Sequence, residues 1–273
     1  MMPKVKPPSE VSRLEVSERL LALLAILDRL RAPDGCPWDR EQTSQSLIPY
    51  LLEETYEVIE SIEAQNNQEL KEELGDLLLH ILMQCKIAEE AGLFSLADSM
   101  EAITAKLINR HPHVFGTDQA EGAFHAKQNW ESAKIREKER DSLLDGVPRN
   151  LPALTRARRI QEKAAYVGFD WDQVEPVWAK VHEELEELTR AHQAGDRAAV
   201  EEELGDVLFS LVNLGRFLGL SSEEALRRTI AKFEYRFRKI EEELKRRGKS
   251  PGESTLEEMD EIWNRYRDEP GEK

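Results

Sequence analysis

Eight acidic residues recur in this sequence as two sets with the same internal spacing. The first set is Glu54, Glu57, Glu73 and Asp76, and the second set, 130 residues further on, is Glu184, Glu187, Glu203 and Asp206. Acids three residues apart lie on one face of a helix. In each set the inner and outer pairs share a midpoint, residue 65 or 195. We therefore expect two antiparallel helical hairpins, each with four carboxylates level across it.

Four converging carboxylates repel one another strongly unless they bind cations or share protons. Oxygen ligands without Cys or paired His favour hard ions, so each set predicts a site for Mg²⁺, or for Mn²⁺, rather than for Zn²⁺. One alternative is a solvated acidic face, which gives no reason for the shared midpoints. A second alternative is an iron-binding carboxylate bundle, which uses Glu-x-x-His. Here the third-residue partner is Asp76 or Asp206 instead.

Two further residue types accompany the acids. His80 lies one turn after Asp76, but the matching residue of the second set is Ser210, so we favour a structural or peripheral role for His80 over a ligand role. Gly75 and Gly205 precede the aspartates, and glycine inside a helix costs about 1 kcal/mol relative to alanine. A close approach of two helices, or of a ligand to the backbone, would explain this; simple tolerance in a long helix is the alternative.

Cationic and aromatic residues follow each hairpin in the same order, a Lys and an Arg one turn apart and then a Trp with a basic residue one turn later. They are Lys106, Arg110, Trp130 and Lys134 in the first half, and Lys232, Arg236, Trp263 and Arg267 in the second. Such cations can bind phosphate oxygens, and Trp can stack on a base or pack in a core. Substrate contact and a structural role both stay open.

The overall composition agrees with a helical protein of two domains. The 273 residues allow roughly two domains of ordinary size. A hydrophobic share of 40% with 34% charged residues suits amphipathic helices rather than sheets. The net charge of −16 argues against a nucleic-acid partner, because such partners need clustered Lys and Arg.

Cysteine usage and hydropathy bear on the compartment. Cys36 and Cys85 are too few for a disulfide scaffold or a thiolate metal site, which indicates a reducing interior. The apolar run at residues 20–27 is far too short to span a bilayer. We expect a cytoplasmic protein with no membrane partner.

Apolar periodicity predicts an all-α fold of two tandem helical bundles, each built on an acidic hairpin. The expected helices cover about 12–31, 43–65, 68–91, 96–110, 122–139, 153–166, 174–194, 197–218, 222–247 and 255–267, with loops at 33–39 and 111–116. Ser95 with Asp98 and Ser221 with Glu224 predict capping boxes. The expected domains are residues 12–140 and 153–268, joined by a linker at 141–152. In the first hairpin, Leu51 and Ile62 belong to an apolar stripe beside the face of Glu54 and Glu57, and Leu74, Leu78, Ile81 and Leu82 are predicted to face a core.

Several motifs resemble the MazG family of nucleoside triphosphate pyrophosphohydrolases. In the first half they are Cys36-Pro37-Trp38-Asp39-x-x-Gln42-Thr43, Leu51-x-Glu53-Glu54-x-Tyr56-Glu57, Glu72-Glu73-Leu74-Gly75-Asp76 and His111-Pro112-His113-Val114-Phe115-Gly116. In the second half they are Val167-Gly168-Phe169-Asp170-Trp171, Glu183-Glu184-x-x-Glu187, Glu202-Glu203-Leu204-Gly205-Asp206 and Lys232-Phe233-x-x-Arg236. The likeness covers nearly the whole chain. Ser44 is a departure, because the family usually has His there.

The resemblance implies an all-α homodimer that uses Mg²⁺ to hydrolyse (deoxy)nucleoside triphosphates to monophosphate and diphosphate. Such a hydrolase of phosphoric anhydrides would serve nucleotide-pool control or clean-up, with broad base tolerance. The C-terminal domain would carry most of the activity. The implied metal ligands are Glu184, Glu187, Glu203 and Asp206, with Glu54, Glu57, Glu73 and Asp76 as N-terminal counterparts. Nucleotide contacts would come from Lys180, Glu184, Lys232, Arg236, Trp263 and Arg267, and Glu183 would accept the proton of the attacking water.

Two other functions remain possible at this point. A related dUTP or phosphoribosyl-ATP pyrophosphohydrolase would differ mainly in the base pocket. A metal- or nucleotide-binding regulatory scaffold would do no chemistry.

Overall fold

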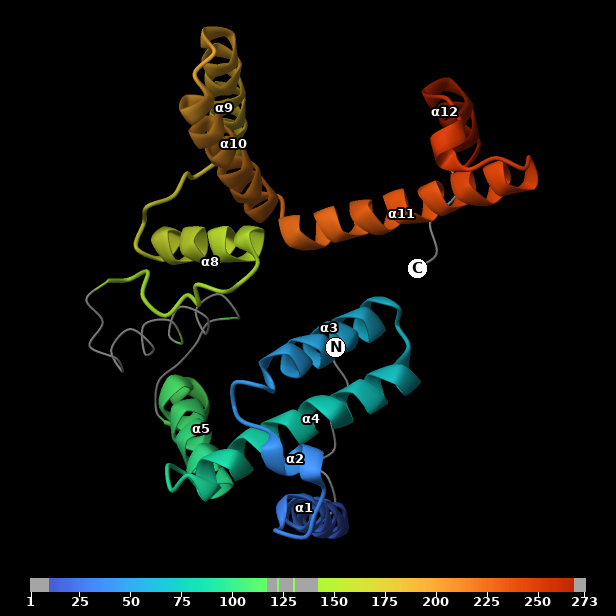
Figure 1. The fold of residues 1–273 in the computed structure, drawn as a ribbon. Helices are drawn as coiled ribbons and strands as arrows, with labels where there is room; N and C mark the ends of the chain where they lie inside the picture. The colour runs from blue at the N-terminus through green and yellow to red at the C-terminus, as the bar shows by residue number, and fades with distance from the viewer. Residues whose placement is uncertain (1–9, 117–121, 123–129, 131–141, 268–273) are drawn as a thin grey trace. The chain divides into compact units, whose positions relative to one another are not determined.

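The computed structural model describes residues 10–116 and 142–267, together with Gly122 and Trp130. The chain divides into two compact units, residues 1–119 (unit 1) and 120–273 (unit 2), and each is described by itself. Every regular element in the described part is a helix (Figure 1), so the all-α prediction is confirmed.

Unit 1 is organised around an antiparallel hairpin of two helices, α3 and α4 (Figure 1). Its helices are α1 (Glu10–Arg31), α2 (Pro37–Glu41), α3 (Ile48–Glu63), α4 (Asn67–Glu90), α5 (Leu96–Arg110) and α6 (Pro112–Phe115). Leu27 of α1 is buried with Leu47, Leu82 and Met83, and other leucines of α1 pack around this cluster. The leucines that recur at helical spacing in the first helix therefore face a core.

The turn of this hairpin lies at its predicted midpoint. Gln65 adopts a left-handed backbone, with φ of 54°. Asn66 then caps α4 by accepting a hydrogen bond from the backbone N–H of Glu69, at 3.3 Å. Further on, Ser95 and Asp98 form both bonds of the predicted capping box at the start of α5.

Three boundaries in unit 1 differ from prediction. The helix expected from residue 43 begins at Ile48, because Thr43 and Ser46 bond each other's backbone and side chains at about 3 Å in a local turn. The loops expected at 33–39 and 111–116 contain the short helices α2 and α6. Each begins with a proline, whose fixed φ suits the first helical position.

Arg31 fixes α2 beside the hairpin. Its side chain is only 7% exposed and its Nη2 lies 2.7 Å from the Glu90 carboxylate at the end of α4. Its other terminal nitrogen donates to the backbone carbonyls of Asp39 and Gln42. One guanidinium thus joins the ends of α1, α2 and α4.

Unit 2 contains a second hairpin of the same kind, α9 and α10. Its helices are α8 (Ala153–Tyr166), α9 (Val174–Ala194), α10 (Arg197–Phe217), α11 (Ser222–Arg246), η1 (Pro251–Glu253) and α12 (Leu256–Arg265). The turn again lies at the midpoint, where Gly195 has φ of 72° and Asp196 caps α10. Val177, Val181 and Leu214 form a small core within the hairpin. A separate cluster of Ile240, Leu244 and Ile262 joins α11 to α12.

Capping in unit 2 departs from prediction in two places. Ser221 caps α11 by accepting from the Glu224 N–H, but the reciprocal bond of the predicted box is not formed. A complete box occurs instead at Ser250 and Glu253, within the segment expected only to break the helix.

The connection between the halves is described only in part. The predicted helix at 122–139, with Lys134, lies outside the described residues apart from Gly122 and Trp130. The turn at 142–146 is fastened to α8, because the buried Lys163 donates from Nζ to the carbonyls of Leu143 and Asp145 at 2.8 and 3.1 Å. The predicted domain limits at 140 and 152 stay predictions.

One prediction about the core is wrong for the single chain. Leu74, Leu78 and Ile81 were expected to face a core, but they are 49%, 40% and 48% exposed, and Ile62 is 55% exposed. The corresponding residues of α10 are exposed to the same degree: Leu204 at 49%, Leu208 at 47% and Leu211 at 43%. Two paired helices cover only one side of each other, which leaves a second apolar face on each hairpin.

Two observations on the described residues concern membrane spans and cysteines. None of their helices is by itself long and apolar enough to cross a membrane; α10 and α11 pass that test only as a pair, bent by 105°. Cys36 and Cys85 are both free thiols.

Candidate functional site

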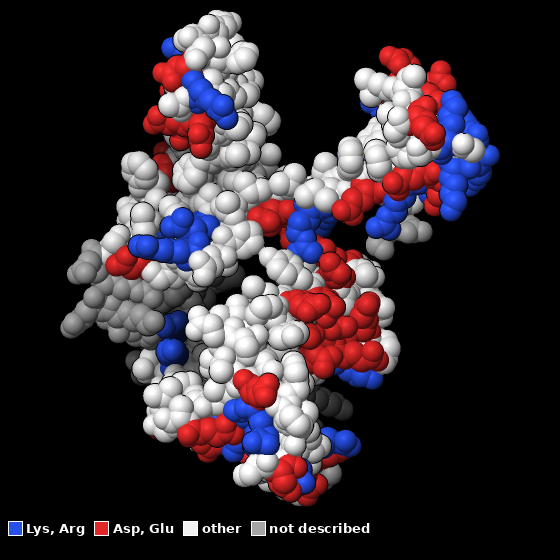
Figure 2. All heavy atoms as spheres, in the orientation of Figure 1, with Lys and Arg blue, Asp and Glu red and all other residues white. Residues whose placement is uncertain are grey.

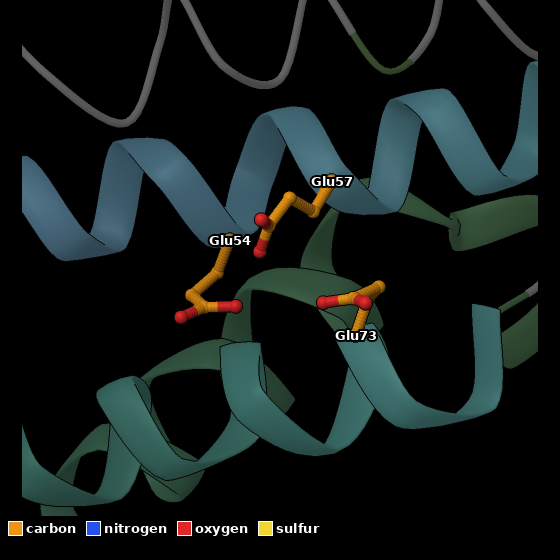
Figure 3. A group of neighbouring side chains, drawn as sticks. All are labelled: Glu54, Glu57 and Glu73. Atoms are coloured by element: carbon orange, nitrogen blue, oxygen red, sulfur yellow. The ribbon is translucent and has the colours of Figure 1, made fainter. Parts of the chain in front are cut away.

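The hairpin of unit 1 brings three of its four predicted acids together. Glu54 and Glu57 of α3 and Glu73 of α4 each offer one oxygen, and these three oxygens lie within 4.8 Å of one another. Figure 3 shows the two α3 side chains pointing toward Glu73. We call Glu54, Glu57 and Glu73 the first carboxylate cage. Asp76 is not a member of this group of three.

The hairpin of unit 2 repeats this arrangement. Glu184 and Glu187 of α9 and Glu203 of α10 also place one oxygen each within 4.8 Å of one another, and we call them the second carboxylate cage. Asp206 is again outside the group. The sequence spacing predicted eight converging acids, and the structure brings six of them together in two groups of three.

Mutual repulsion is evident in the protonation of both cages. Burial, followed by the charges of Glu57 and Asp76, raises the pKa of Glu54 from its ordinary 4.5 to about 7. Burial and the neighbouring acids also raise the pKa of Glu73 in the first cage and of Glu203 in the second. The aspartates thus act on the cages through their charge. Figure 2 shows acidic side chains gathered over the α3–α4 hairpin.

Aromatic residues flank the first cage. His80 Nε2 lies 3.8 Å from Glu54 Oε1, too far for a hydrogen bond. The His80 ring is parallel to that of Tyr50, with 6.4 Å between centroids, and Tyr50 meets the edge of Trp38 at 6.0 Å. His80 thus lies at the margin of the acids, in keeping with a peripheral role.

A lysine flanks the second cage instead. Lys180 Nζ lies 2.7 Å from Glu184 Oε1 and 2.9 Å from Glu183 Oε1. These two bonds raise the pKa of Lys180. The Glu184 side chain is only 8% exposed. The ammonium of Lys180 compensates the charge of this buried carboxylate. Sequence reasoning assigned Lys180 to the nucleotide and missed this pair, although its spacing of four residues was the available signal.

The donor set of each cage suits a divalent ion with hard oxygen ligands. Mg²⁺ binds oxygens at about 2.0–2.1 Å, which places neighbouring ligand oxygens about 3 Å apart and opposite ones about 4 Å apart. Three carboxylate oxygens within 4.8 Å reach that geometry by small side-chain adjustments. No cysteine contributes to either group, and His80 is outside the first group. The fit is therefore to a divalent ion that prefers oxygen ligands.

The remaining predicted residues of unit 2 meet one another where α11 and α12 pack. The Arg236 guanidinium lies 5.3 Å from the centroid of the Trp263 ring and donates to the carbonyl of Arg267. Phe233 approaches the same Trp at 5.2 Å, whereas Lys232 is exposed. Within residues 142–267, no hydrogen bond, ion pair or ring contact joins Lys232, Arg236 or Trp263 to the second cage.

The counterparts from the first half of the sequence are Lys106 and Arg110, in unit 1, and Trp130, which falls in unit 2. Lys106 is exposed on α5, whereas Arg110 is buried, with 8% exposure, at the end of the same helix. Trp130 is partly buried. The two lysines are thus both exposed and the two tryptophans both partly buried, whereas the buried Arg110 differs from the partly buried Arg236.

Comparison with known proteins agrees with the duplication. The MazG nucleotide pyrophosphohydrolase domain matches this chain twice, over residues 42–115 and 173–240. The chain belongs to the MazG family. Each MazG match contains one complete set of acids, and the second also contains Lys180, Lys232 and Arg236 but ends before Trp263 and Arg267.

Relatives in this family align over most of their length. The MazG nucleoside triphosphate pyrophosphohydrolase/pyrophosphatase of Thermotoga maritima is 45% identical, over 89% of this chain and 93% of the relative. A nucleoside triphosphate pyrophosphohydrolase of Escherichia coli K12 is 46% identical, over 90% and 95%. The YabN protein of Bacillus subtilis is 42% identical over 94% of this chain but only 53% of its own length.

Proposed function

We propose that this protein hydrolyses (deoxy)nucleoside triphosphates to the monophosphate and diphosphate. The observation that carries the proposal is the pair of carboxylate cages, each inside a match to a nucleotide pyrophosphohydrolase domain. Relatives that align over nearly their whole length are named for the same activity. Broad base tolerance, and a role in nucleotide-pool control or clean-up, belong to the proposal.

The metal is Mg²⁺ or Mn²⁺ in this proposal. Glu184, Glu187 and Glu203 would hold it in unit 2, with Asp206 as the fourth acid, and Glu54, Glu57, Glu73 and Asp76 would do so in unit 1. Such an ion neutralises phosphate charge and lowers the pKa of bound water. Repulsion among the acids of each cage favours its binding.

The protein's own residues supply the remaining chemistry. A water oxygen attacks the α-phosphorus, the bond from that phosphorus to the bridging oxygen breaks, and diphosphate leaves. Glu183, exposed and one residue before Glu184, takes the proton of the attacking water. Lys232 and Arg236 offset the charge on the leaving diphosphate. Trp263 and Arg267 complete the nucleotide contacts, which requires Arg236 to exchange its present partners for phosphate.

We assign most of the activity to the C-terminal domain, over residues 153–268, and treat 12–140 as its N-terminal counterpart. Among residues 10–116 and 142–267, a lysine contacts the second cage but none contacts the first, and a lysine can also contact phosphate.

We also propose that the protein is a cytoplasmic homodimer. The exposed leucines of α4 and α10 give each hairpin an uncovered apolar face, and a twofold partner is the commonest way to cover one. The free thiols suit a reducing compartment.

The test is diphosphate release from a panel of nucleotides. ATP, dGTP, dUTP and phosphoribosyl-ATP are incubated with the protein and Mg²⁺, and with EDTA in place of the metal. We expect metal-dependent diphosphate and monophosphate from several bases. Turnover of dUTP or phosphoribosyl-ATP alone would place the protein with those related enzymes. Binding without any product would identify a regulatory scaffold and refute the proposal.

A further inference from the structure

Lys180 pairs with Glu184, the member of the second cage whose carboxylate is almost completely buried. Its ammonium lies 2.7 Å from Glu184, whose side chain is 8% exposed, while Lys180 itself is 36% exposed. A second cation also contacts this cage, because Arg190 Nη2 lies 3.2 Å from Glu187 Oε1, but that pair is far more exposed, at 68% for Arg190 and 35% for Glu187. The ammonium therefore lies where a buried carboxylate most needs a positive charge.

This contact competes with any divalent ion in the same cage. An ion held by Glu184, Glu187 and Glu203 would bind the same carboxylate that pairs with Lys180. Its positive charge would also repel the ammonium. Lysine has a flexible stem and three rotatable donors, so its head can leave while its backbone stays in place. Because Lys180 is on α9, one turn before Glu184, a displaced ammonium stays close to the cage.

We propose that Lys180 is a displaceable counter-ion: it holds Glu184 in the metal-free protein and moves to a phosphate oxygen of the nucleotide when a divalent ion takes the cage. This inference rests on the proposed function, because it needs both a metal and a nucleotide at the second cage. It adds that one side chain links metal binding to nucleotide binding. Lys180 weakens the binding of the metal alone and strengthens the binding of the metal together with the nucleotide.

The first cage provides an internal comparison. The residue at the position of Lys180 is Tyr50, which has no charge to offer and instead stacks on His80. Within the residues that the structure describes, the first cage therefore has no lysine to displace, and metal binding there should not be linked to nucleotide binding in this way.

The test measures Mn²⁺ binding by calorimetry, first alone and then as the complex with a non-hydrolysable α,β-imido analogue of dATP. The full-length protein carries Glu57→Gln and Glu73→Gln, so that binding reports the second cage. Lys180→Met and Lys180→Arg are compared with Lys239→Met, a control that removes a lysine paired with Glu242 on α11 at 3.0 Å.

We expect Lys180→Met to bind Mn²⁺ alone about three- to tenfold more tightly, because the ion pair between Lys180 and Glu184 no longer competes with the metal. The same variant should bind the Mn²⁺–nucleotide complex about tenfold more weakly, because a charge-assisted bond to phosphate is lost. Lys180→Arg should lie between Lys180→Met and the parent in both measurements, and Lys239→Met should match the parent.

Opposite changes in the two affinities are the signature of the proposal. Unchanged or weaker Mn²⁺ binding in Lys180→Met would make Lys180 a plain phosphate contact and overturn the counter-ion role. Unchanged nucleotide binding would overturn the transfer to phosphate. Failure of the parent to bind Mn²⁺ at all would instead refute the metal site of the proposed function, and the inference with it.

The reverse substitution keeps the test independent of how well Lys180→Met folds. In a protein with Glu187→Gln and Glu203→Gln, Tyr50→Lys places a lysine beside the first cage. It should weaken Mn²⁺ binding there about threefold or more. No weakening, in a variant that retains the helical circular dichroism of the parent, would contradict a competing ammonium.

Discussion

The two carboxylate cages use the same acids at the same spacing, yet their surroundings differ. Beside the first cage are Tyr50 and His80, and in the described part of the chain no ammonium group contacts Glu54. At the matching positions beside the second cage are Lys180 and Ser210, and Lys180 contacts Glu184 directly. Burial and the neighbouring acids raise the pKa of Glu54 to about 7 in the first cage and also raise the pKa of Glu203 in the second, but only in the second cage does an ion pair with lysine, among the described residues, offset one of the acids.

This difference shows where duplicated sites diverge. The acids have the same positions because the hairpin geometry needs them at one level. The residues one turn away from the acids are not under that constraint, and they decide how each cage is charged before a ligand arrives. The comparison therefore predicts two units with different chemistry in one chain.

The largest expected effect separates the units by activity. Glu203→Gln replaces a charged ligand oxygen of the second cage and should lower diphosphate release by about 100-fold or more. The matched change Glu73→Gln, in the first cage, should cost about twofold or less if unit 2 carries the reaction. The measurement is turnover at saturating Mg²⁺ and nucleotide. Equal losses would show that both cages take part.

The second effect separates the cages by pH in metal-free protein. Below pH 4.5, Glu54 is protonated in both folded and unfolded chains. Between pH 4.5 and about 7 the unfolded chain loses this proton first, so the folded state loses stability as pH rises. The difference in pKa corresponds to about 3 kcal/mol. Glu54→Gln should remove this loss in urea unfolding with EDTA at pH 8, and change little at pH 4.

The matched control is in the second cage. Glu184→Gln removes the partner of Lys180 and should give no gain in stability at pH 8, because the repulsion there is already offset by an ion pair. A pH dependence that is the same with and without Glu54→Gln would contradict the assignment to the first cage.

A third effect compares the exposed apolar faces of the hairpins. Leu78→Glu and Leu208→Glu each place a charge at a leucine that is exposed in the single chain, so neither should unfold the monomer. A charge buried at a dimer interface costs several kcal/mol, and about 2 kcal/mol weakens association about 30-fold. Sedimentation should show which hairpin forms the dimer. A dimer that survives both changes would exclude these faces as the interface.

The sequence predicted the hairpins because repeated acids and apolar periodicity both depend on helix geometry, which is local. It also predicted the turns, since Asn66 and Asp196 have side chains that cap a helix. It failed where the outcome depended on side-chain competition or on what covers a surface. Thr43 and Ser46 closed a local turn in place of a helical one, and Leu74 lies exposed although its periodicity resembles that of a core residue.

The candidate site was predictable to the same extent. Spacing alone placed three acids of each cage together, because they are on facing turns of paired helices. It did not distinguish the cages, because the pairing of Lys180 with Glu184 and the stacking of Tyr50 on His80 depend on side-chain conformation. Nor did it separate the exposed Lys106 from the buried Arg110 one turn later.

The smallest expected effect concerns Gly75 and Gly205, which precede the aspartates in α4 and α10. A Cβ added at either position meets nothing within 4 Å in the single chain, so close helix packing within a unit is not the reason for glycine. Alanine there should stabilise the metal-free protein by up to about 1 kcal/mol through helix propensity alone. Thermal unfolding measures this gain. Gly215→Ala, later in α10, should gain less, because its Cβ would lie 2.5 Å from Ser222 Oγ.

Turnover of the same variants then sharpens the comparison of the units. If a nucleotide approaches the backbone at the second cage, Gly205→Ala should be more stable yet several-fold less active, because the added methyl blocks that approach. Gly75→Ala should be more stable with unchanged turnover. Full activity in both variants would show that the helices merely tolerate these glycines. It would also contradict a close approach of the nucleotide to the backbone at Gly205.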